Sequence, residues 1–252
     1  MKTFKKDKLE VRIFDTRAEM GVAAAKDVSA CIKQLLNEKP YINMIFAAAP
    51  SQNEVLAALK ADTSIEWNRI NAFHMDEYIG LDAKAPQGFA NFLRDALFDH
   101  VPFKSVNTLD STAIAAEEAA RYSELLKANP VDIVCMGIGE NGHIAFNDPH
   151  VADFNDKLLV KEVMLDDVCR MQQVHDGCFD SLDKVPKSAL TLTIPMLCSA
   201  KYQFCVVPAP TKANAARATV EGEITEACPA SILRTLDNAI MYLDKDSGKY
   251  LL

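Results

Sequence analysis

The chain alternates short apolar runs with longer segments of helical spacing, and this alternation limits its folds more than any other feature. Residues 9–14 alternate apolar and polar side chains, as a half-buried strand does. Thr16 and Glu19 then form a capping box, which predicts a helix that ends near Glu38. The continuously apolar residues 41–48 predict a strand buried on both faces. The chain therefore begins as strand, helix, strand.

The same alternation continues to the end of the chain. Ser51 and Glu54 form a second capping box, which predicts a helix over residues 51–59. Further strands are predicted over residues 70–75, 131–137, 189–194, 203–207 and 239–243, and further helices over residues 89–98, 113–126 and 211–220. Parallel strands need crossover connections, so this order predicts a doubly wound, mostly parallel sheet in a three-layer α/β/α sandwich. No repeat or linker divides the chain, so we expect residues 1–252 to form a single domain.

Composition excludes several classes of protein. Apolar residues make up 49% of the chain and charged residues 25%, which is too apolar for a disordered protein. The net charge of −8 argues against nucleic acid or an anionic membrane as a partner. No apolar run resembles a membrane span or the core of a signal peptide, and the seven scattered cysteines suit a reducing compartment. We expect a cytoplasmic protein, and the sequence leaves open whether it forms a homo-oligomer.

The segment 137–149 is the most informative one for chemistry. It follows a predicted strand, and ligands bind beyond the carboxyl ends of such strands. Its three glycines permit positive φ angles and close approach of a ligand. Asn141 and Asp148 flank His143 and can orient its imidazole, which predicts a proton carrier. The glycine spacing also fits a plain tight loop, or a dinucleotide fingerprint, although a fingerprint is expected at an early strand.

Three further positions follow predicted strands. Asp76 and Glu77 come after residues 70–75, where a buried carboxylate can remove a proton from carbon beside a carbonyl; a capping or surface acidic pair is the alternative. Lys212 begins a predicted helix, where a lysine is unfavourable unless it binds an anion, and an exposed lysine is the alternative. Ser51 opens a similar helix terminus. No Cys-x-x-Cys or His-x-x-x-His spacing occurs, so we predict neither a metal nor a cofactor.

Residues 73–81 and 137–149 together resemble the two signature segments of the glucosamine-6-phosphate deaminase/isomerase family, relatives of 6-phosphogluconolactonase. Residues 185–191 and the turn at Lys212 follow in the family's order, so the resemblance spans about residues 42–222. It implies an enzyme of amino-sugar metabolism whose partner is a small sugar phosphate. The expected reaction converts glucosamine-6-phosphate or galactosamine-6-phosphate to a ketose phosphate and ammonia, by aldose-ketose isomerisation.

The resemblance also implies a role for each matching residue. His143, supported by Asp148, moves a proton as the sugar ring opens, and Asp76 then shuttles a proton between C2 and C1 through an enediol-like intermediate. Lys212 binds the substrate phosphate, and residues 151–187 cover the region of a mobile lid. The implied catalytic residues are Asp76, Asn141, His143 and Asp148, and the implied substrate-binding residues are Ala48, Ser51, Gln52, Glu77, Gly139, Gly142, Arg170 and Lys212.

The sequence departs from the family pattern at three places. Asn141 stands where the family usually has Asp, and Asp148 where it usually has Glu. Residues 47–53 replace a glycine-rich phosphate loop, and only Arg170 is a candidate for the lid arginine that holds phosphate. Two other functions therefore stay open, a lactone hydrolase like 6-phosphogluconolactonase and a sugar-phosphate-binding protein with weak catalysis.

Overall fold

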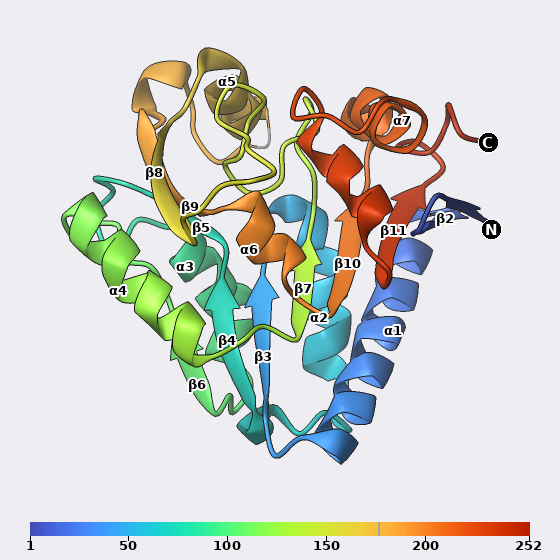
Figure 1. Ribbon diagram of the computed structural model, residues 1–252, viewed down its shortest axis with the longest axis horizontal. Helices are drawn as coiled ribbons and strands as arrows, with labels where there is room; N and C mark the ends of the chain where they lie inside the picture. The colour runs from blue at the N-terminus through green and yellow to red at the C-terminus, as the bar shows by residue number, and fades with distance from the viewer. Residues whose placement is uncertain (176) are drawn as a thin grey trace.

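The computed structural model describes residues 1–175 and 177–252, and it confirms the predicted three-layer α/β/α architecture (Figure 1). Within these residues the central sheet runs in the order β1-β2-β11-β10-β7-β3-β4-β6. Its pairings are parallel except that of β1 with β2. The strands of this sheet are β1 (Lys2–Lys6), β2 (Leu9–Phe14), β3 (Ile42–Phe46), β4 (Ile70–His74), β6 (Ser105–Asn107), β7 (Ile133–Met136), β10 (Tyr202–Val207) and β11 (Ala239–Asp244).

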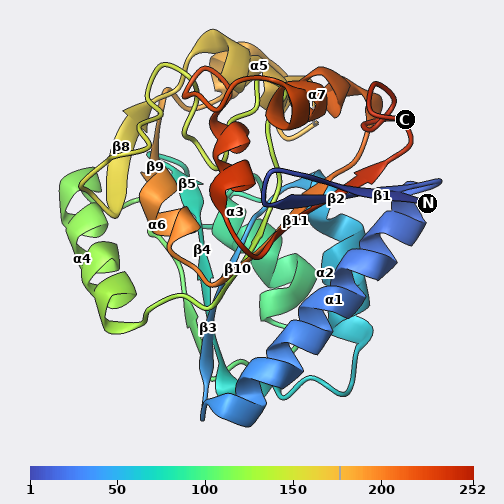
Figure 2. The same cartoon turned by 45° about the vertical axis from the view of Figure 1, so that its right-hand side comes forward.

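Helices cover both faces of this sheet (Figures 1 and 2). The first face packs against α1 (Arg17–Glu38), α2 (Asn53–Ala61) and α3 (Phe89–Leu93), and the second against α4 (Ala115–Ala128), α6 (Ile194–Cys198) and α7 (Ala213–Glu221). Within β3, Phe46 belongs to the core on the first face and Ile45 to the core on the second, because successive strand residues point to opposite faces. Burial on both sides explains why β3 and β7 are almost wholly apolar, with Asn43 the one polar residue between them.

A second, smaller sheet was missed by the sequence prediction. It consists of β5 (Asp76–Tyr78), β9 (Ser188–Leu192) and β8 (Val160–Met164), in that order and antiparallel. The strand predicted over residues 189–194 ends early, because the Thr193 side chain caps α6 by accepting the backbone N–H of Met196. Residues 151–187 contain β8 and also α5 (Asp167–His175), and position 176 within them lies outside the described residues.

The two predicted capping boxes have different outcomes. The Thr16 box is confirmed, since the Glu19 N–H donates to the Thr16 hydroxyl and the Thr16 N–H to the Glu19 carboxylate, both at 3.1 Å. The Ser51 box is wrong. Pro50–Gln52 forms a 3₁₀ turn, and α2 starts afterwards without a side-chain cap. The Glu54 carboxylate is instead directed to Arg17, from which its Oε1 accepts a hydrogen bond at 2.7 Å, while its Oε2 has no hydrogen-bond partner among the described residues.

Two other predicted helices begin or end irregularly. The helix over residues 89–98 is α3 followed by a π-helical turn, Arg94–Phe98, and the helix over residues 211–220 is a 3₁₀ turn, Pro210–Lys212, followed by α7. A membrane-spanning helix, which requires a long apolar stretch, is not found in the described part of the chain.

The strands β10, β7, β3 and β4 are neighbours in the sheet and parallel. Their carboxyl ends therefore lie along one edge. The loops that leave this edge contain the residues that the sequence singled out, so the sheet topology brings together side chains from distant parts of the chain.

Candidate active site

A cleft of about 390 Å³ opens at this edge of the central sheet. Its described lining comes from the loops after β10, β7, β3 and β4, from α3 and the segment before it, from α5 and the residues after it, and from the first turn of α1. The predicted site residues that line it are Ala48, Ser51, Asp76, Gly139, His143 and Lys212. The predicted site residues outside its described lining are Gln52, Glu77, Asn141, Gly142, Asp148 and Arg170. Most residues of this second group contact or neighbour a residue of the first group and help to position it.

Glycines shape the catalytic loop, the name we give to residues 137–149. The Gly139 N–H donates to the carbonyl of His143 at 2.9 Å, and the Gly142 N–H donates to the carbonyl of Gly139 at 3.1 Å. Gly142 has a φ of +83°, which a residue with a side chain rarely adopts. A Cβ at Gly139 would overlap the imidazole ring of His143. The position of His143 thus depends on both glycines, on Gly142 for its positive φ and on Gly139 for the space that it leaves.

His143 is held by a carboxylate that is itself held in place. Nδ1 of His143 lies 2.9 Å from Oδ1 of Asp148. The Asn141 amide donates to the same oxygen at 2.8 Å, and its carbonyl accepts the backbone N–H of His143 at 3.0 Å. Burial favours a higher pKa for Asp148, but the hydrogen bonds and charge interaction with His143 and the Asn141 bond outweigh it and lower the pKa to about 2. Asp148 therefore stays ionised beside the imidazole.

Asp76 is a buried carboxylate at the cleft surface. It lies on β5 opposite Thr191 of β9 and is 7% exposed. Burial first, and the neighbouring charge of Glu77 second, raise the pKa of Asp76 well above its usual value. Glu77 instead accepts backbone N–H groups from Tyr78, Phe89 and Ala90 at 2.8–3.0 Å. The predicted pair thus separates into one group that can exchange a proton with a ligand and one that anchors the start of α3.

Two cationic side chains line the same cleft. Lys212 is buried at the end of its 3₁₀ turn and lines the cleft, so the alternative of an exposed lysine is wrong. Arg17, in the first turn of α1, donates to Glu54 and to the carbonyl of Pro50. A guanidinium has five N–H donors, so these two contacts leave donors for an anion. Arg17 and Lys212, with Ser51 beside them in the cleft lining, give the site its positive charge.

The loop after β3, residues 47–53, is called the anion loop below. The side-chain amide of Gln52 lies beneath it and donates to Ser51 and to the carbonyls of Met136 and Val206, at 3.0–3.4 Å. Gln52 is 1% exposed and lies outside the described cleft lining, so its position suits holding this loop to β7 and β10 rather than contacting a ligand.

The described residues of α5 present glutamines to the cleft. Gln172 and Gln173 line it, together with Gly177 and Cys178 just beyond the helix. The Arg170 guanidinium points elsewhere, since it donates to the carbonyls of Leu182 and Val185 and to the carboxylate of Asp167. Arg170 therefore ties α5 to the following turn and does not meet the cleft in this conformation.

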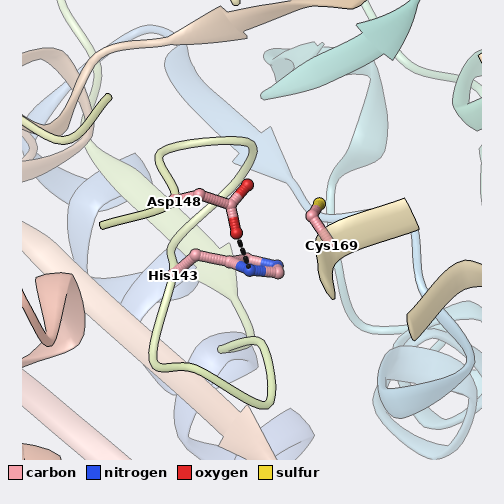
Figure 3. Close-up of side chains that lie close together, drawn as sticks. All are labelled: His143, Asp148 and Cys169. Carbon is pink, nitrogen blue, oxygen red and sulfur yellow. Dashed lines mark hydrogen bonds and ion pairs between the residues drawn. The ribbon is translucent and has the colours of Figure 1, made fainter. Parts of the chain in front are cut away.

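Sequence reasoning missed Arg17, Gln172 and Gln173. A signal for Arg17 existed, because it lies three residues after the carboxyl end of β2, a parallel neighbour of β11 in the central sheet. No signal existed for the two glutamines, because their segment showed no regular periodicity. Cys169 of α5 was also missed. It lies beside His143 and Asp148, and the three side chains form a group able to hold a metal (Figure 3).

Comparison with known proteins adds to this geometry. Residues 15–242 match the model of the family described as glucosamine-6-phosphate isomerases/6-phosphogluconolactonase. A glucosamine-6-phosphate deaminase of Bacillus cereus (strain B4264) is 29% identical over 240 residues, which are 95% of this chain and 88% of the relative. One from Streptococcus suis (strain 05ZYH33) is 33% identical over 193 residues, which are 75% of this chain and 80% of the relative.

The fold also has close structural counterparts. The solved structure of a monomeric glucosamine-6-phosphate deaminase superposes with a TM-score of 0.85 at 28% identity, over 95% of this chain and 98% of that one.

Proposed function

Because the chain belongs to the family of glucosamine-6-phosphate isomerases and 6-phosphogluconolactonases, we propose that it converts a hexosamine 6-phosphate to a ketose 6-phosphate and ammonia. The observation that carries the proposal is one cleft lined by a protonatable carboxylate, Asp76, by a supported imidazole, His143, and by two cations, Arg17 and Lys212. This set matches what isomerisation of an anionic sugar needs: a base for carbon, a proton carrier for oxygen and a counter-charge for phosphate.

Ring opening is the first task, and His143 performs it. With Nδ1 donating to ionised Asp148, Nε2 is the nitrogen that accepts the proton of the anomeric hydroxyl and returns one to the ring oxygen. Asn141 keeps the Asp148 carboxylate oriented, and Gly139 leaves room for the imidazole ring of His143. The product of this step is the open-chain aldehyde.

Asp76 then moves a proton between two carbons. Its ionised form removes the proton from C2, next to the aldehyde, and the electrons form an enolamine, the amino counterpart of an enediol. The raised pKa makes the carboxylate a stronger base and lets it hold the proton until C1 accepts it. C2 then carries an iminium group; water adds to this carbon, ammonia leaves, and the ketose phosphate remains.

Cationic side chains contribute more to phosphate binding than the backbone amides of the anion loop do. The methyl groups of Ala47, Ala48 and Ala49 limit how closely a phosphate can approach the amides of the anion loop. Arg17 and Lys212 supply the attraction instead, and the Ser51 hydroxyl adds a neutral donor. Residues 151–187 act as the lid over this site, and the support for this role is that residues of α5 already line the cleft.

Purified protein with glucosamine-6-phosphate or galactosamine-6-phosphate tests the proposal directly. Ammonia and ketose phosphate are expected in equal amounts from at least one of the two, and His143→Ala is expected to abolish both. No turnover of either sugar would contradict the proposal. If 6-phosphogluconolactone were hydrolysed above its spontaneous rate, the function would be that of a lactone hydrolase. Thermal stabilisation by the sugars without turnover would indicate a binding protein.

A further inference from the structure

Three side chains able to bind a metal lie close together (Figure 3), and one of them, His143, lines the cleft. His143 and Asp148 come from the catalytic loop, and Cys169 comes from α5. Each offers one ligand atom, and these atoms all lie within 4.8 Å of one another. All three residues are buried, with at most 7% of any of them exposed. A local search of the sequence could not find this group, because Cys169 is 21 positions from Asp148, with β8 between them.

An unsatisfied oxygen lies in this group. Both hydrogen bonds to Asp148 from His143 and Asn141 go to Oδ1. Oδ2 is buried and has no regular hydrogen-bond partner among the described residues. The Cys169 thiol is near enough to help lower the pKa of Asp148, but a thiol is a weak donor. A buried carboxylate oxygen without a strong partner is costly, and a cation would remove that cost.

We propose that His143, Asp148 and Cys169 form an inhibitory Zn²⁺ site. Imidazole nitrogen, carboxylate oxygen and thiolate sulfur are the ligands that Zn²⁺ takes in proteins, and three such ligands leave the fourth position open. The site borders the cleft, because His143 is part of the cleft lining. Magnesium and calcium prefer oxygen ligands alone and fit this set poorly.

Little movement is needed to form the site. The ligand atoms of a tetrahedral zinc site are about 3.3–3.8 Å apart, given zinc bonds of about 2.0–2.3 Å. The present separations reach at most 4.8 Å, so contraction by about 1 Å completes the geometry. Cys169 lies in the first turn of α5, whose start is fixed by a 2.8 Å bond from the Cys169 N–H to Asp166. A small shift of that turn towards the catalytic loop supplies the contraction.

Binding exchanges a proton for the metal. Zn²⁺ displaces the thiol proton of Cys169 to solvent and binds the resulting thiolate, the ionised Asp148 and an unprotonated nitrogen of His143. No redox step is involved. Affinity therefore rises with pH. The metal occupies the imidazole and carboxylate that open the sugar ring, so zinc inhibits the enzyme; only this consequence rests on the proposed function.

Zinc binding by the purified full chain, measured by titration calorimetry without substrate, tests the proposal. One tight Zn²⁺ per chain is expected. Cys169→Ala is expected to weaken binding at least about tenfold, since loss of even an outer-shell partner costs 10- to 100-fold. Co²⁺ is expected to give a thiolate-to-cobalt absorption band in the wild type and none in Cys169→Ala. Cys198→Ser, on α6, and Cys178→Ser, at the cleft but outside the group, are the matched controls and keep wild-type zinc binding.

Two results would overturn the proposal: absence of tight zinc binding by the wild type, or unchanged binding by Cys169→Ala with a wild-type melting curve. If Cys169→Ala fails to fold, Cys169→Ser replaces it, and the cobalt band of that variant decides in the same way. Because none of these measurements uses a sugar, a protein that fails to turn over hexosamine phosphates would still test the metal site.

Discussion

The catalytic loop and the anion loop face the same cleft, but their geometry is fixed by different means. In the catalytic loop, Gly139 and Gly142 are required by steric contact and positive φ, and the polar side chains bond to one another. The anion loop has three alanines and a proline and no positive φ angle. It is held from outside, by Gln52 beneath it and by Arg17 from α1.

Under the proposed function, this difference matches the task of each loop. Proton transfer depends on orientation, so a displacement of about 1 Å is costly and the local sequence is tightly constrained. Attraction of a phosphate depends on charge, which a side chain from another element can supply. In the proposed function, Arg17 from α1 supplies such a charge to the site.

The largest effect is expected from the catalytic carboxylate. Asp76→Asn keeps the size of the side chain and removes its ability to take a proton from C2, so kcat should fall by about 10³-fold with little change in KM. Steady-state kinetics on the preferred hexosamine phosphate measure this. Activity within tenfold of the wild type would show that another group is the base.

One substitution of a small residue in each loop tests the comparison of the two loops. Gly139→Ala places a methyl group against the imidazole, so kcat/KM should fall by about 100-fold, as a displacement of about 1 Å would cause. Ala48→Gly needs no rearrangement and should leave kcat unchanged, with a small stability loss of about 0.5–1 kcal/mol. Equal losses of activity in the two variants would contradict the distinction between the loops.

Removal of Arg17, the cationic side chain that α1 contributes to the cleft, is expected to weaken substrate binding. A charge-assisted hydrogen bond contributes about 1.5–3 kcal/mol, so Arg17→Ala should raise KM at least about tenfold and leave kcat nearly unchanged. Inorganic phosphate should lose affinity as an inhibitor by the same factor. Arg217→Ala, an exposed arginine of α7 paired with Glu221, is the control and should change neither value. A fall in kcat with constant KM would argue against a phosphate contact.

Glu77 tunes the pH profile. Asp76 accepts a proton only when ionised, so kcat/KM rises with pH through its raised pKa. Glu77→Gln removes the neighbouring negative charge, which lowers the pKa of Asp76. The rise of kcat/KM should therefore occur at lower pH in this variant. The variant should also melt at a lower temperature, because it keeps only one of the two oxygens that accept the N–H groups of Phe89 and Ala90. A rise of kcat/KM that shifts to higher pH would contradict the claim that the charge of Glu77 raises the pKa of Asp76.

Much of the fold could be predicted because the central sheet obeys local rules. The run at residues 41–48 and the Thr16 capping box fix β3 and α1 from nearby residues alone. The small sheet could not be predicted, because β5 has three residues and β8 pairs with a strand 28 positions further along. The Ser51 capping box failed for a similar reason, since Glu54 binds Arg17, which is 37 positions away.

The same limit applies to the site. His143, Asp148 and Asn141 were found because they share one loop, and Asp76 because it follows a strand of the sheet. Cys169 and the cleft-lining Gln172 were not found, because only the packing of α5 against the catalytic loop brings them there. Local sequence predicts which groups can react, and the fold determines which distant groups surround them.

Hydrogen exchange in D₂O tests most directly the central claim that Asp76 moves a proton between C1 and C2. Fructose-6-phosphate is incubated with the protein and ammonium, which supplies the nitrogen of the C2 iminium, and the signals of its C1 hydrogens are followed by NMR. The wild type is expected to replace one C1 hydrogen with deuterium, and Asp76→Asn is expected to leave both in place. Exchange at equal rates in the two proteins, or none in a wild type that turns over hexosamine phosphate, would contradict the account.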